Sequence, residues 1–453
     1  MTFVIDPLHP DAALSIYEAA REHPEGVCLR TREGDITFAE AAERAASIFP
    51  TLTLPAPGRP YVMTAKTDVH TMLVFYALLA AKVPMLLLSP KLTESETQAY
   101  IKAAELIREP LPADAAVVIF TSGTTGPSKP AVLSRRALAA NALAVSSHIA
   151  MDERDVWLLS LSPARVGGLG ILTRALSCRA GVALGAKYSA AGFVSELTDM
   201  KVTIASLVPA MLIDVLEHFP DWTPPEAFRL LLVGGSACPV SVRRRALAAR
   251  IPVVTTYAMT ETASSVGMSP YEDRLTENFC ADRPLKGVEF RLTDSGEVEV
   301  RGNMLMNGYW GRKPLAPGAW HATGDIAVMD DAGGLRIQAR QSEVLITGGE
   351  KVYPSEVELA LEEIEGVAGA VVAGIPDEKW GVIVGALLVA SPNAAAIPAQ
   401  AIARAVRSQL AAYKCPRRIA WVKALPRTRE GKLRRTPDIF ESIALETLHY
   451  TTL

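Results

Sequence analysis

A segment rich in glycine and hydroxyl side chains is the first candidate for chemistry. It follows an apolar run at 115–120 and reads Thr121-Ser122-Gly123-Thr124-Thr125-Gly126-Pro127-Ser128-Lys129. Glycines let the backbone approach a ligand closely, so successive N–H groups can cradle phosphate oxygens, and Lys129 adds a positive charge. A Walker A loop differs, because it has four residues between its glycines and a lysine directly after the second. The segment predicts a phosphate-binding loop of another kind, the alternative being a plain surface loop.

Further segments that mix glycine with polar residues follow in order along the chain. They read Gly234-Gly235-Ser236-Ala237-Cys238-Pro239, Tyr257-Ala258-Met259-Thr260-Glu261, Trp320-His321-Ala322-Thr323-Gly324-Asp325, RQSEVLITGGEKVYP from Arg340 to Pro354, and Leu425-Pro426-Arg427-Thr428 followed by Gly431-Lys432. With the phosphate loop, they resemble the ordered motifs of the adenylate-forming superfamily, which includes acyl-CoA synthetases, nonribosomal peptide adenylation domains and luciferases. The resemblance covers nearly the whole chain, and the GGEKVYP run is most similar to acyl- and aryl-CoA ligases.

The resemblance implies an ATP-dependent reaction that begins with an acyl-adenylate. A carboxylate attacks the α-phosphate of ATP, so the site must supply positive charge and orientation to two anions. The loop from Thr121 to Lys129 would hold the β- and γ-phosphates. The segment from Gly234 to Ala237 would lie against adenine, with Tyr257 in the same nucleotide site. Thr260 would contact phosphate, and Glu261 would bind Mg2+, a hard cation that prefers carboxylate oxygen.

Other motif residues take their roles from the same resemblance. Asp325, with Arg340 nearby, would accept the ribose hydroxyls, because a carboxylate is an acceptor that suits a diol. Lys432 would bridge the attacking carboxylate and the α-phosphate. Taken singly, each residue has a plainer explanation: Glu261 can cap a helix, Asp325 can occupy a Gly-Asp turn, and Lys432 can belong to an exposed basic tail.

In this superfamily a small C-terminal domain rotates between two half-reactions, adenylation and transfer of the acyl group to a thiol. The hinge position, usually aspartate, is Glu343 here, which keeps the charge and adds one methylene. Gly348 and Gly349 would let the pantetheine chain of coenzyme A pass close to the backbone. The resemblance thus implies an acid–thiol ligase that uses ATP, Mg2+ and coenzyme A.

Departures from the family pattern bear on the acid substrate. Pro130 stands where glycine is usual, which removes a backbone donor and fixes φ. The positions that usually carry an aromatic residue and a histidine are Ala164 and Arg165. This opens space and adds a guanidinium able to bind a second carboxylate or stack on an aryl ring, unless Arg165 points outward or pairs with a local acid. The other residues expected to shape the acyl pocket are Val166, Gly168, Ala258 and Met259.

The stretch between Lys102 and Ala115 is short, since most relatives carry an extra strand and helix there. In this missing segment and in its length of 453 residues, the chain resembles the o-succinylbenzoate–CoA ligases of menaquinone biosynthesis. We therefore expect a small aryl or dicarboxylic acid, o-succinylbenzoate-like or benzoate-like. One alternative is an enzyme that loads an acyl carrier protein or an amine in secondary metabolism. Another is a catalytically silent nucleotide-binding homologue, for which Pro130, Arg165 and Glu343 would be the evidence.

Apolar patterning predicts an α/β fold with two domains. The expected strands of the first lie at 115–121, 155–161, 202–208, 228–235 and 251–257. Most are followed by helical periodicity, which predicts a mainly parallel sheet covered by helices. Alternation between about 285 and 340 predicts a small antiparallel β subdomain. We place an N-terminal AMP-binding domain at 1–340 and a small mobile α+β domain, which carries Lys432, at 341–453.

Composition argues against several other classes of protein. The net charge of -3 gives no support for nucleic acid as a partner, and five scattered cysteines fit a reducing cytosol rather than disulfides or zinc. The N-terminus lacks a signal-peptide pattern. Lys82 and Pro84 divide the apolar stretch at 72–88, so neither part has the roughly 20 residues of a membrane span. We expect a cytoplasmic enzyme without stable membrane insertion, as a monomer or a homodimer.

Overall fold

The computed structural model describes residues 10–121, 128–279, 282–331, 333–391, 397–428, 433–448 and 450. Tertiary contacts divide the chain into two compact units. The first consists of Met1–Gly235, Ala246–Phe290 and Val300–His321, and the second of Ser236–Arg245, Arg291–Glu299 and Ala322–Leu453. The domain boundary placed at residue 340 from the sequence stays a prediction.

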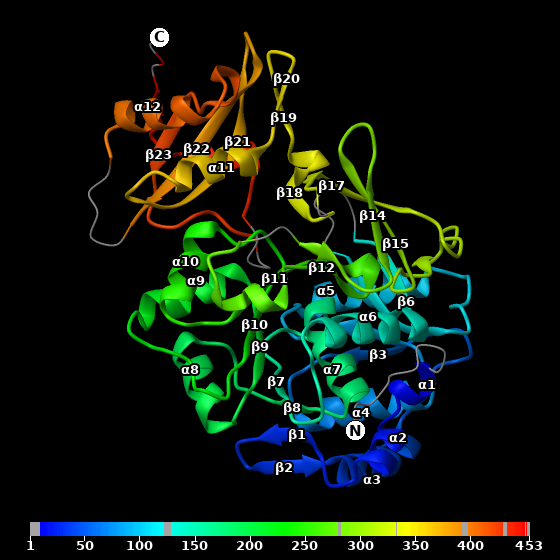
Figure 1. The fold of residues 1–453 in the computed structure, drawn as a ribbon. Coiled ribbons are helices and arrows are strands. Elements are labelled where there is room, and N and C mark those ends of the chain that lie inside the picture. Colours follow the sequence, from blue (N-terminus) through cyan, green and yellow to red (C-terminus); the bar gives the residue numbers. More distant parts are fainter. Residues whose placement is uncertain are drawn as a thin grey trace. The chain divides into compact units, whose positions relative to one another are not determined.

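The strands of the first unit form two sheets (Figure 1). The nine-stranded sheet has the order β13 (Arg283–Pro284), β12 (Ser264–Met268), β11 (Val253–Met259), β10 (Leu230–Val233), β9 (Ile204–Leu207), β7 (Val156–Leu158), β8 (Gly181–Ala183), β1 (Val27–Thr31), β2 (Gly34–Thr37). The five-stranded sheet has the order β16 (Gly308–Tyr309), β6 (Pro130–Ser134), β5 (Ala115–Phe120), β4 (Met85–Leu88), β3 (Tyr61–Thr64). The run from β11 to β1 in the larger sheet is parallel throughout, which confirms the predicted α/β fold.

The strands predicted at 155–161, 202–208 and 228–235 are shorter than the sequence suggested. The apolar run at 155–161 forms β7 only over Val156–Leu158. Ser160 then leaves the ladder, because its hydroxyl donates to the Ser206 carbonyl and its backbone N–H donates to the Leu158 carbonyl. Apolar character alone does not show where such a side-chain hydrogen bond ends a strand.

Several helices of the first part of the chain begin at polar caps. They are α1 (Pro10–Ala13), α2 (Ile16–Glu22), α3 (Phe38–Ile48), α4 (Val69–Ala80), α5 (Glu94–Glu105), α6 (Arg135–His148), α7 (Val166–Cys178), α8 (Ala190–Asp199), α9 (Pro209–His218) and α10 (Val240–Ala248). Asp68 caps α4 by accepting a hydrogen bond from the N–H of Thr71, and Ser134 caps α6 in the same way. Helix α4 is buried along its middle, and the buried strand β4 follows it. Within the described part of the chain, every helix is too short or too polar to cross a membrane.

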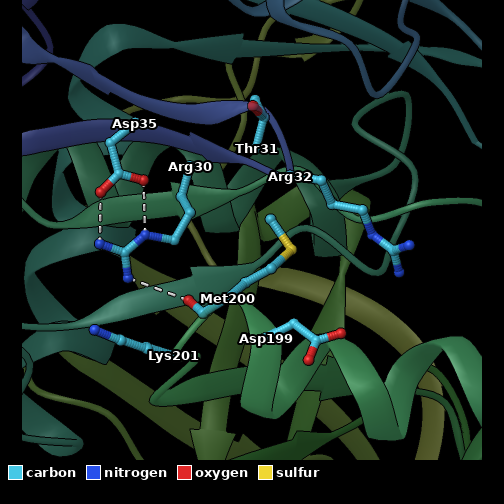
Figure 2. Close-up of a pocket in the computed structure, with 7 residues that line it drawn as sticks. All are labelled: Arg30, Thr31, Arg32, Asp35, Asp199, Met200 and Lys201. Atoms are coloured by element: carbon cyan, nitrogen blue, oxygen red, sulfur yellow. Dashed lines mark hydrogen bonds and ion pairs between the residues drawn. The ribbon is translucent and has the colours of Figure 1, made fainter.

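A cavity of about 310 Å³ lies between the β1–β2 hairpin and the end of α8 (Figure 2). Its guanidinium groups belong to Arg30 and Arg32. Arg30 donates two 2.8 Å hydrogen bonds to Asp35 and a third, of 3.1 Å, to the Met200 carbonyl. Its charge is therefore already matched, and none of the residues assigned to chemistry from the sequence lines this cavity.

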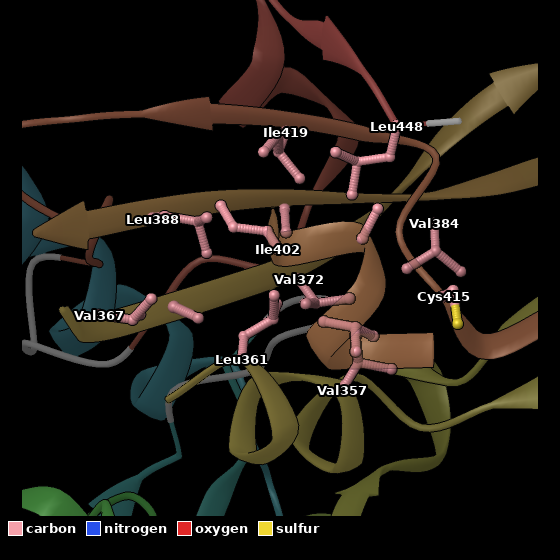
Figure 3. Packing of buried hydrophobic residues seen from close by; sticks show 14 of the residues in the cluster. Val357, Leu361, Val367, Val372, Val384, Leu388, Ile402, Cys415, Ile419 and Leu448 are labelled. Carbon is pink, nitrogen blue, oxygen red and sulfur yellow. The ribbon is translucent and has the colours of Figure 1, made fainter. Parts of the chain in front are cut away.

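The next strands along the chain form a four-stranded sheet. Its order is β14 (Val288–Leu292), β15 (Glu297–Gly302), β17 (His321–Met329), β18 (Leu335–Arg340). The remaining elements are the hairpin β19 (Leu345–Thr347) and β20 (Glu350–Val352), α11 (Pro354–Glu362), β21 (Val367–Asp377), β22 (Gly381–Ala390), α12 (Ala399–Gln409), β23 (Arg418–Trp421) and β24 (Glu446–Thr447). Strands β21 to β24 form one sheet. Side chains such as Val357, Val372 and Ile402 pack α11 and α12 against it (Figure 3).

Two acidic side chains of α11 accept hydrogen bonds from the backbone of β21. Glu358 is buried, and its carboxylate accepts a 2.9 Å hydrogen bond from the N–H of Val372. Glu362 accepts one of 3.2 Å from the N–H of Ala370. Burial raises the pKa of Glu362 from 4.5 to about 7, and the neighbouring Glu358 adds to the rise.

This raised pKa predicts a pH-dependent stability. Between the ordinary carboxyl pKa and about 7, folded Glu362 holds a proton that the unfolded chain has released, so the free energy of unfolding falls as pH rises. Glu362→Gln keeps an acceptor for the N–H of Ala370 and removes this loss of stability, which is on the order of 3 kcal/mol at pH 8. Calorimetry at pH 5 and pH 8 should show a higher unfolding temperature for the variant at pH 8 only. The exposed neighbour Glu363, changed to Gln, is the control; an unchanged wild-type slope in Glu362→Gln would contradict the prediction.

Candidate active site

The predicted motif that begins at Gly234 lies at the carboxyl ends of the parallel strands of the larger sheet. Strands β9, β10 and β11 are parallel neighbours, so the residues after their carboxyl ends meet there, where open α/β sheets bind ligands. Gly234 follows β10, and a Cβ there would lie 2.6 Å from the Thr256 side chain. Gly235 has a positive φ of 86°. Ser236 and Ala237 continue this segment in the second unit's part of the chain.

The described residues close the base of the predicted phosphate loop. The N–H of Thr121 donates to the Lys129 carbonyl at 2.9 Å, and the N–H of Lys129 donates to the Thr121 hydroxyl at 3.4 Å. Pro130 begins β6 opposite Phe120, and its carbonyl accepts from the N–H of Trp310. A proline at this position therefore fits the strand. The residues between, Ser122, Gly123, Thr124, Thr125 and Gly126, lie outside the described residues.

A carboxylate, a phenol and a lysine come together beside this loop. Glu261 belongs to a 3-10 helix, Thr260–Thr262, directly after β11. Its carboxylate accepts a 2.7 Å hydrogen bond from the Tyr309 hydroxyl, and the ammonium group of Lys129 lies 5.3 Å from the centroid of the Tyr309 ring. Tyr309 therefore positions both charges, the lysine by a cation–π contact. The sequence analysis did not predict a role for Tyr309, for which the Gly308-Tyr309-Trp310 run was the available signal.

This arrangement fits a magnesium ion held mainly by phosphate. Among the described residues no three His, Cys, Asp or Glu side chains gather as a metal site. Mg2+ commonly takes one or two carboxylates and completes its shell with water and substrate phosphates. Glu261, half-buried and held by Tyr309, can supply such a carboxylate.

The predicted acyl-pocket residues come from β11 and from the start of α7. Arg165 precedes α7, and its guanidinium donates a 3.3 Å hydrogen bond to the carbonyl of Phe120, the residue before the phosphate loop. Val166 begins the helix. Gly168 has no room for a side chain, since a Cβ there would lie 2.3 Å from the Ser162 carbonyl oxygen. Ala258 and Met259 end β11 directly before Thr260.

A buried arginine within α7 was not singled out from the sequence. Arg174 is 1% exposed, and its guanidinium donates a 2.9 Å hydrogen bond to the amide oxygen of Asn141. That amide in turn donates to the carbonyl of Ser265 at 2.8 Å. Among the described residues the Nε of Arg174 has no hydrogen-bond partner, and its guanidinium donates to neutral groups, the Asn141 amide oxygen and the Ser265 hydroxyl. Burial lowers the pKa of Arg174 to about 9, so the group keeps its positive charge at neutral pH.

Three further groups of predicted residues lie in the second unit. Asp325 and Arg340 face each other across β17 and β18, with the arginine Nε 2.8 Å from a carboxylate oxygen. Glu343 ends a 3-10 helix, Gln341–Glu343, directly after β18. Gly348 and Gly349 form the turn between β19 and β20, with φ of 56° and 88°. Lys432 lies outside the described residues.

Two family models match the chain. The AMP-binding enzyme model covers residues 105–310, and the AMP-binding enzyme C-terminal domain model covers residues 356–432. The 2-succinylbenzoate–CoA ligase of Bacillus cereus (strain AH820) is 28% identical over 91% of this chain and 95% of its own length. The ligase of the same name from Bacillus mycoides (strain KBAB4) is 32% identical over 74% of this chain and 72% of its own length.

Solved structures share the fold. The o-succinylbenzoate CoA synthetase of Bacillus subtilis, in complex with the acyl-adenylate intermediate OSB-AMP, superposes with a TM-score of 0.78 at 24% identity, covering 96% of this chain and 99% of its own. ATP-bound MatB of Rhodopseudomonas palustris gives 0.80 at 25% identity, covering 93% and 97%. The chain belongs to the AMP-binding enzyme family. The predicted enzyme class, an AMP-forming acid–CoA ligase, is confirmed by the family and by the names of its relatives.

The contact between Tyr309 and Glu261 predicts a loss of adenylation in Tyr309→Phe. The variant keeps the ring beneath Lys129 but removes the hydrogen bond to the carboxylate, which costs about tenfold in kcat/KM and raises the Mg2+ concentration for half-maximal rate. Acid-dependent pyrophosphate release over a magnesium titration measures both. Tyr271→Phe, which removes a phenol bonded to Arg229 instead, is the matched control. A Tyr309→Phe enzyme with the wild-type magnesium dependence would contradict the assignment.

Proposed function

We propose that this chain is a 2-succinylbenzoate–CoA ligase. It would join one carboxylate of the acid to AMP from ATP, release pyrophosphate, and then transfer the acyl group to the thiol of coenzyme A. The names of relatives that align over most of the chain support this substrate. We place the enzyme in the cytoplasm, in line with the free thiols of Cys28, Cys178, Cys238 and Cys415.

The buried charge of Arg174 is the structural observation that supports a dicarboxylic acid as the substrate. A buried guanidinium with only neutral partners is costly, because burial removes the water that stabilised its charge. A second carboxylate of the substrate would offset that cost. Arg174 lies on the helix that begins with the pocket residues Val166 and Gly168, and Asn141 links it to the strand after Glu261. Inside a protein a fixed charge attracts an anion over several ångströms, so a dicarboxylic acid is favoured over a plain benzoate.

The adenylation step follows from where the charges lie. Lys129 is exposed at the end of the phosphate loop, and its charge can lower the repulsion between the triphosphate and the incoming carboxylate. Glu261 would hold Mg2+, which neutralises phosphate oxygens when bound. By the family resemblance, Asp325 would bind the ribose and Lys432 would supply the remaining charge at the α-phosphate.

The turn at Gly348 favours coenzyme A over a carrier protein as the acceptor. The N–H of Gly348 donates to the Trp380 carbonyl at 3.0 Å, and a Cβ at this glycine would lie 2.6 Å from the indole. The guanidinium of Arg417 lies 4.7 Å from the Trp380 ring centroid and the ammonium group of Lys379 lies 5.3 Å from it. Both cations are exposed, so they offer contacts to the phosphates of a nucleotide. An acyl carrier protein has no nucleotide to use them.

The test is a panel of acids offered with ATP, Mg2+ and coenzyme A to the wild type and to Arg174→Met. We expect pyrophosphate release and a CoA thioester, detected by mass spectrometry, with 2-succinylbenzoate ahead of benzoate and aliphatic acids. Arg174→Met should raise the KM for 2-succinylbenzoate about tenfold or more and leave the KM for benzoate nearly unchanged, because only the former has a second carboxylate.

Thermal unfolding separates this role from a structural one. Met fills a similar volume without a buried charge, so Arg174→Met should unfold at the wild-type temperature or above. Arg136→Met, at an exposed position of α6, is the control. Equal loss on both acids would contradict a role for Arg174 in choosing the acid, and a thioester formed only from benzoate or aliphatic acids would overturn the proposed substrate. Release without any thioester would shift the acceptor to a carrier protein or an amine.

A further inference from the structure

The hinge residue of the second unit carries an ion pair that the resemblance did not suggest. A guanidinium nitrogen of Arg435 lies 3.1 Å from a carboxylate oxygen of Glu343. The side chains are 18% and 21% exposed, so water screens the pair only in part. The same guanidinium donates two 2.8 Å hydrogen bonds to Glu358, one to each carboxylate oxygen.

Arg435 is held rigidly by this second contact. Glu358 lies on α11, is buried, and also accepts the N–H of Val372 on β21. A bidentate arginine–carboxylate pair fixes direction as well as distance. Glu343 and Glu358 together raise the pKa of Arg435 above its ordinary value, so the group is always charged. Arg435 is therefore anchored to α11 through Glu358, while Glu343 belongs to the segment that precedes this helix.

We propose that the Glu343–Arg435 ion pair is a latch that favours one of the two orientations of the C-terminal domain and so sets the balance between the half-reactions. Hinge motion comes from large changes of φ and ψ at few residues. A change of ψ at residue 343 turns everything that follows, Arg435 included, away from the Glu343 side chain. The pair can form in one setting of this torsion, so its free energy adds to that orientation alone. The inference rests on the proposed two-step function.

The ion pair with Arg435 depends on the length of the Glu343 side chain. The family usually has aspartate at the hinge, and this chain has the longer residue. Shortening the side chain by one carbon–carbon bond withdraws the carboxylate by about 1.5 Å, which takes a 3.1 Å contact beyond hydrogen-bond range. Aspartate at 343 should therefore behave like a residue without charge, although it restores the usual residue of the family.

The test compares Glu343→Gln and Glu343→Asp with the wild type in each half-reaction. Adenylation is followed as acid-dependent exchange of pyrophosphate into ATP, and transfer as a single turnover of preformed acyl-adenylate with coenzyme A. Both variants should change the ratio of the two rates about fivefold or more, with one rate falling and the other kept or raised. Glu363→Gln, at an exposed position after α11, should leave the ratio unchanged.

Other outcomes decide against the latch. A purely structural role would lower both rates by the same factor, and a role for charge alone would leave Glu343→Asp at the wild-type ratio. Either result overturns the proposal, as does an unchanged ratio in both variants. A wild type without either half-reaction would overturn the proposed function and the latch with it, whereas an active wild type keeps the two failures distinct.

Discussion

Repulsion between two anions is the constraint on which the rest of this structure depends, because a carboxylate must approach a triphosphate. The protein meets it with positive charges of two kinds. Lys129 is exposed and lies over the Tyr309 ring, so its charge can follow phosphate oxygens. Arg174 is buried among neutral groups, where it cannot move and where its field is weakly screened. The charge of Lys129 suits phosphates that enter as part of ATP and leave as pyrophosphate, and we propose that the charge of Arg174 suits an acid that must be held in one place.

The second unit has to keep a compact core if, as we propose, the segment at Glu343 serves as a hinge. Strands β21 to β24 and the helices α11 and α12 bury their own apolar side chains, so the core does not need the hinge to hold it together. Glu343 contacts Arg435, and Arg435 contacts Glu358, which accepts a hydrogen bond from Val372 on β21. The glycine turn beside Trp380 belongs to the same unit, so hinge and acceptor site would move together.

Local sequence predicted those features that depend on neighbouring residues. Continuous apolar runs marked the positions of β5, β9, β10 and β11. The contacts of Tyr309, Arg174 and Arg435 could not be predicted, because their partners lie far along the chain: Tyr309 and Glu261 are 48 residues apart, and Arg435 and Glu343 are 92 apart. Tertiary packing brings such residues together, and a local sequence pattern does not predict it. The roles of Ser122 to Gly126 and of Lys432 stay predictions.

The most direct test of the central claim follows the oxygen atoms of the acid. If the carboxylate of 2-succinylbenzoate attacks the α-phosphate, an acid labelled with oxygen-18 in its carboxylates leaves one labelled oxygen in the AMP released after transfer to coenzyme A. The account predicts labelled AMP and unlabelled pyrophosphate by mass spectrometry. Label in inorganic phosphate, or CoA thioester formed with unlabelled AMP, would show that the carboxylate attacks another phosphorus or none, and would contradict the account.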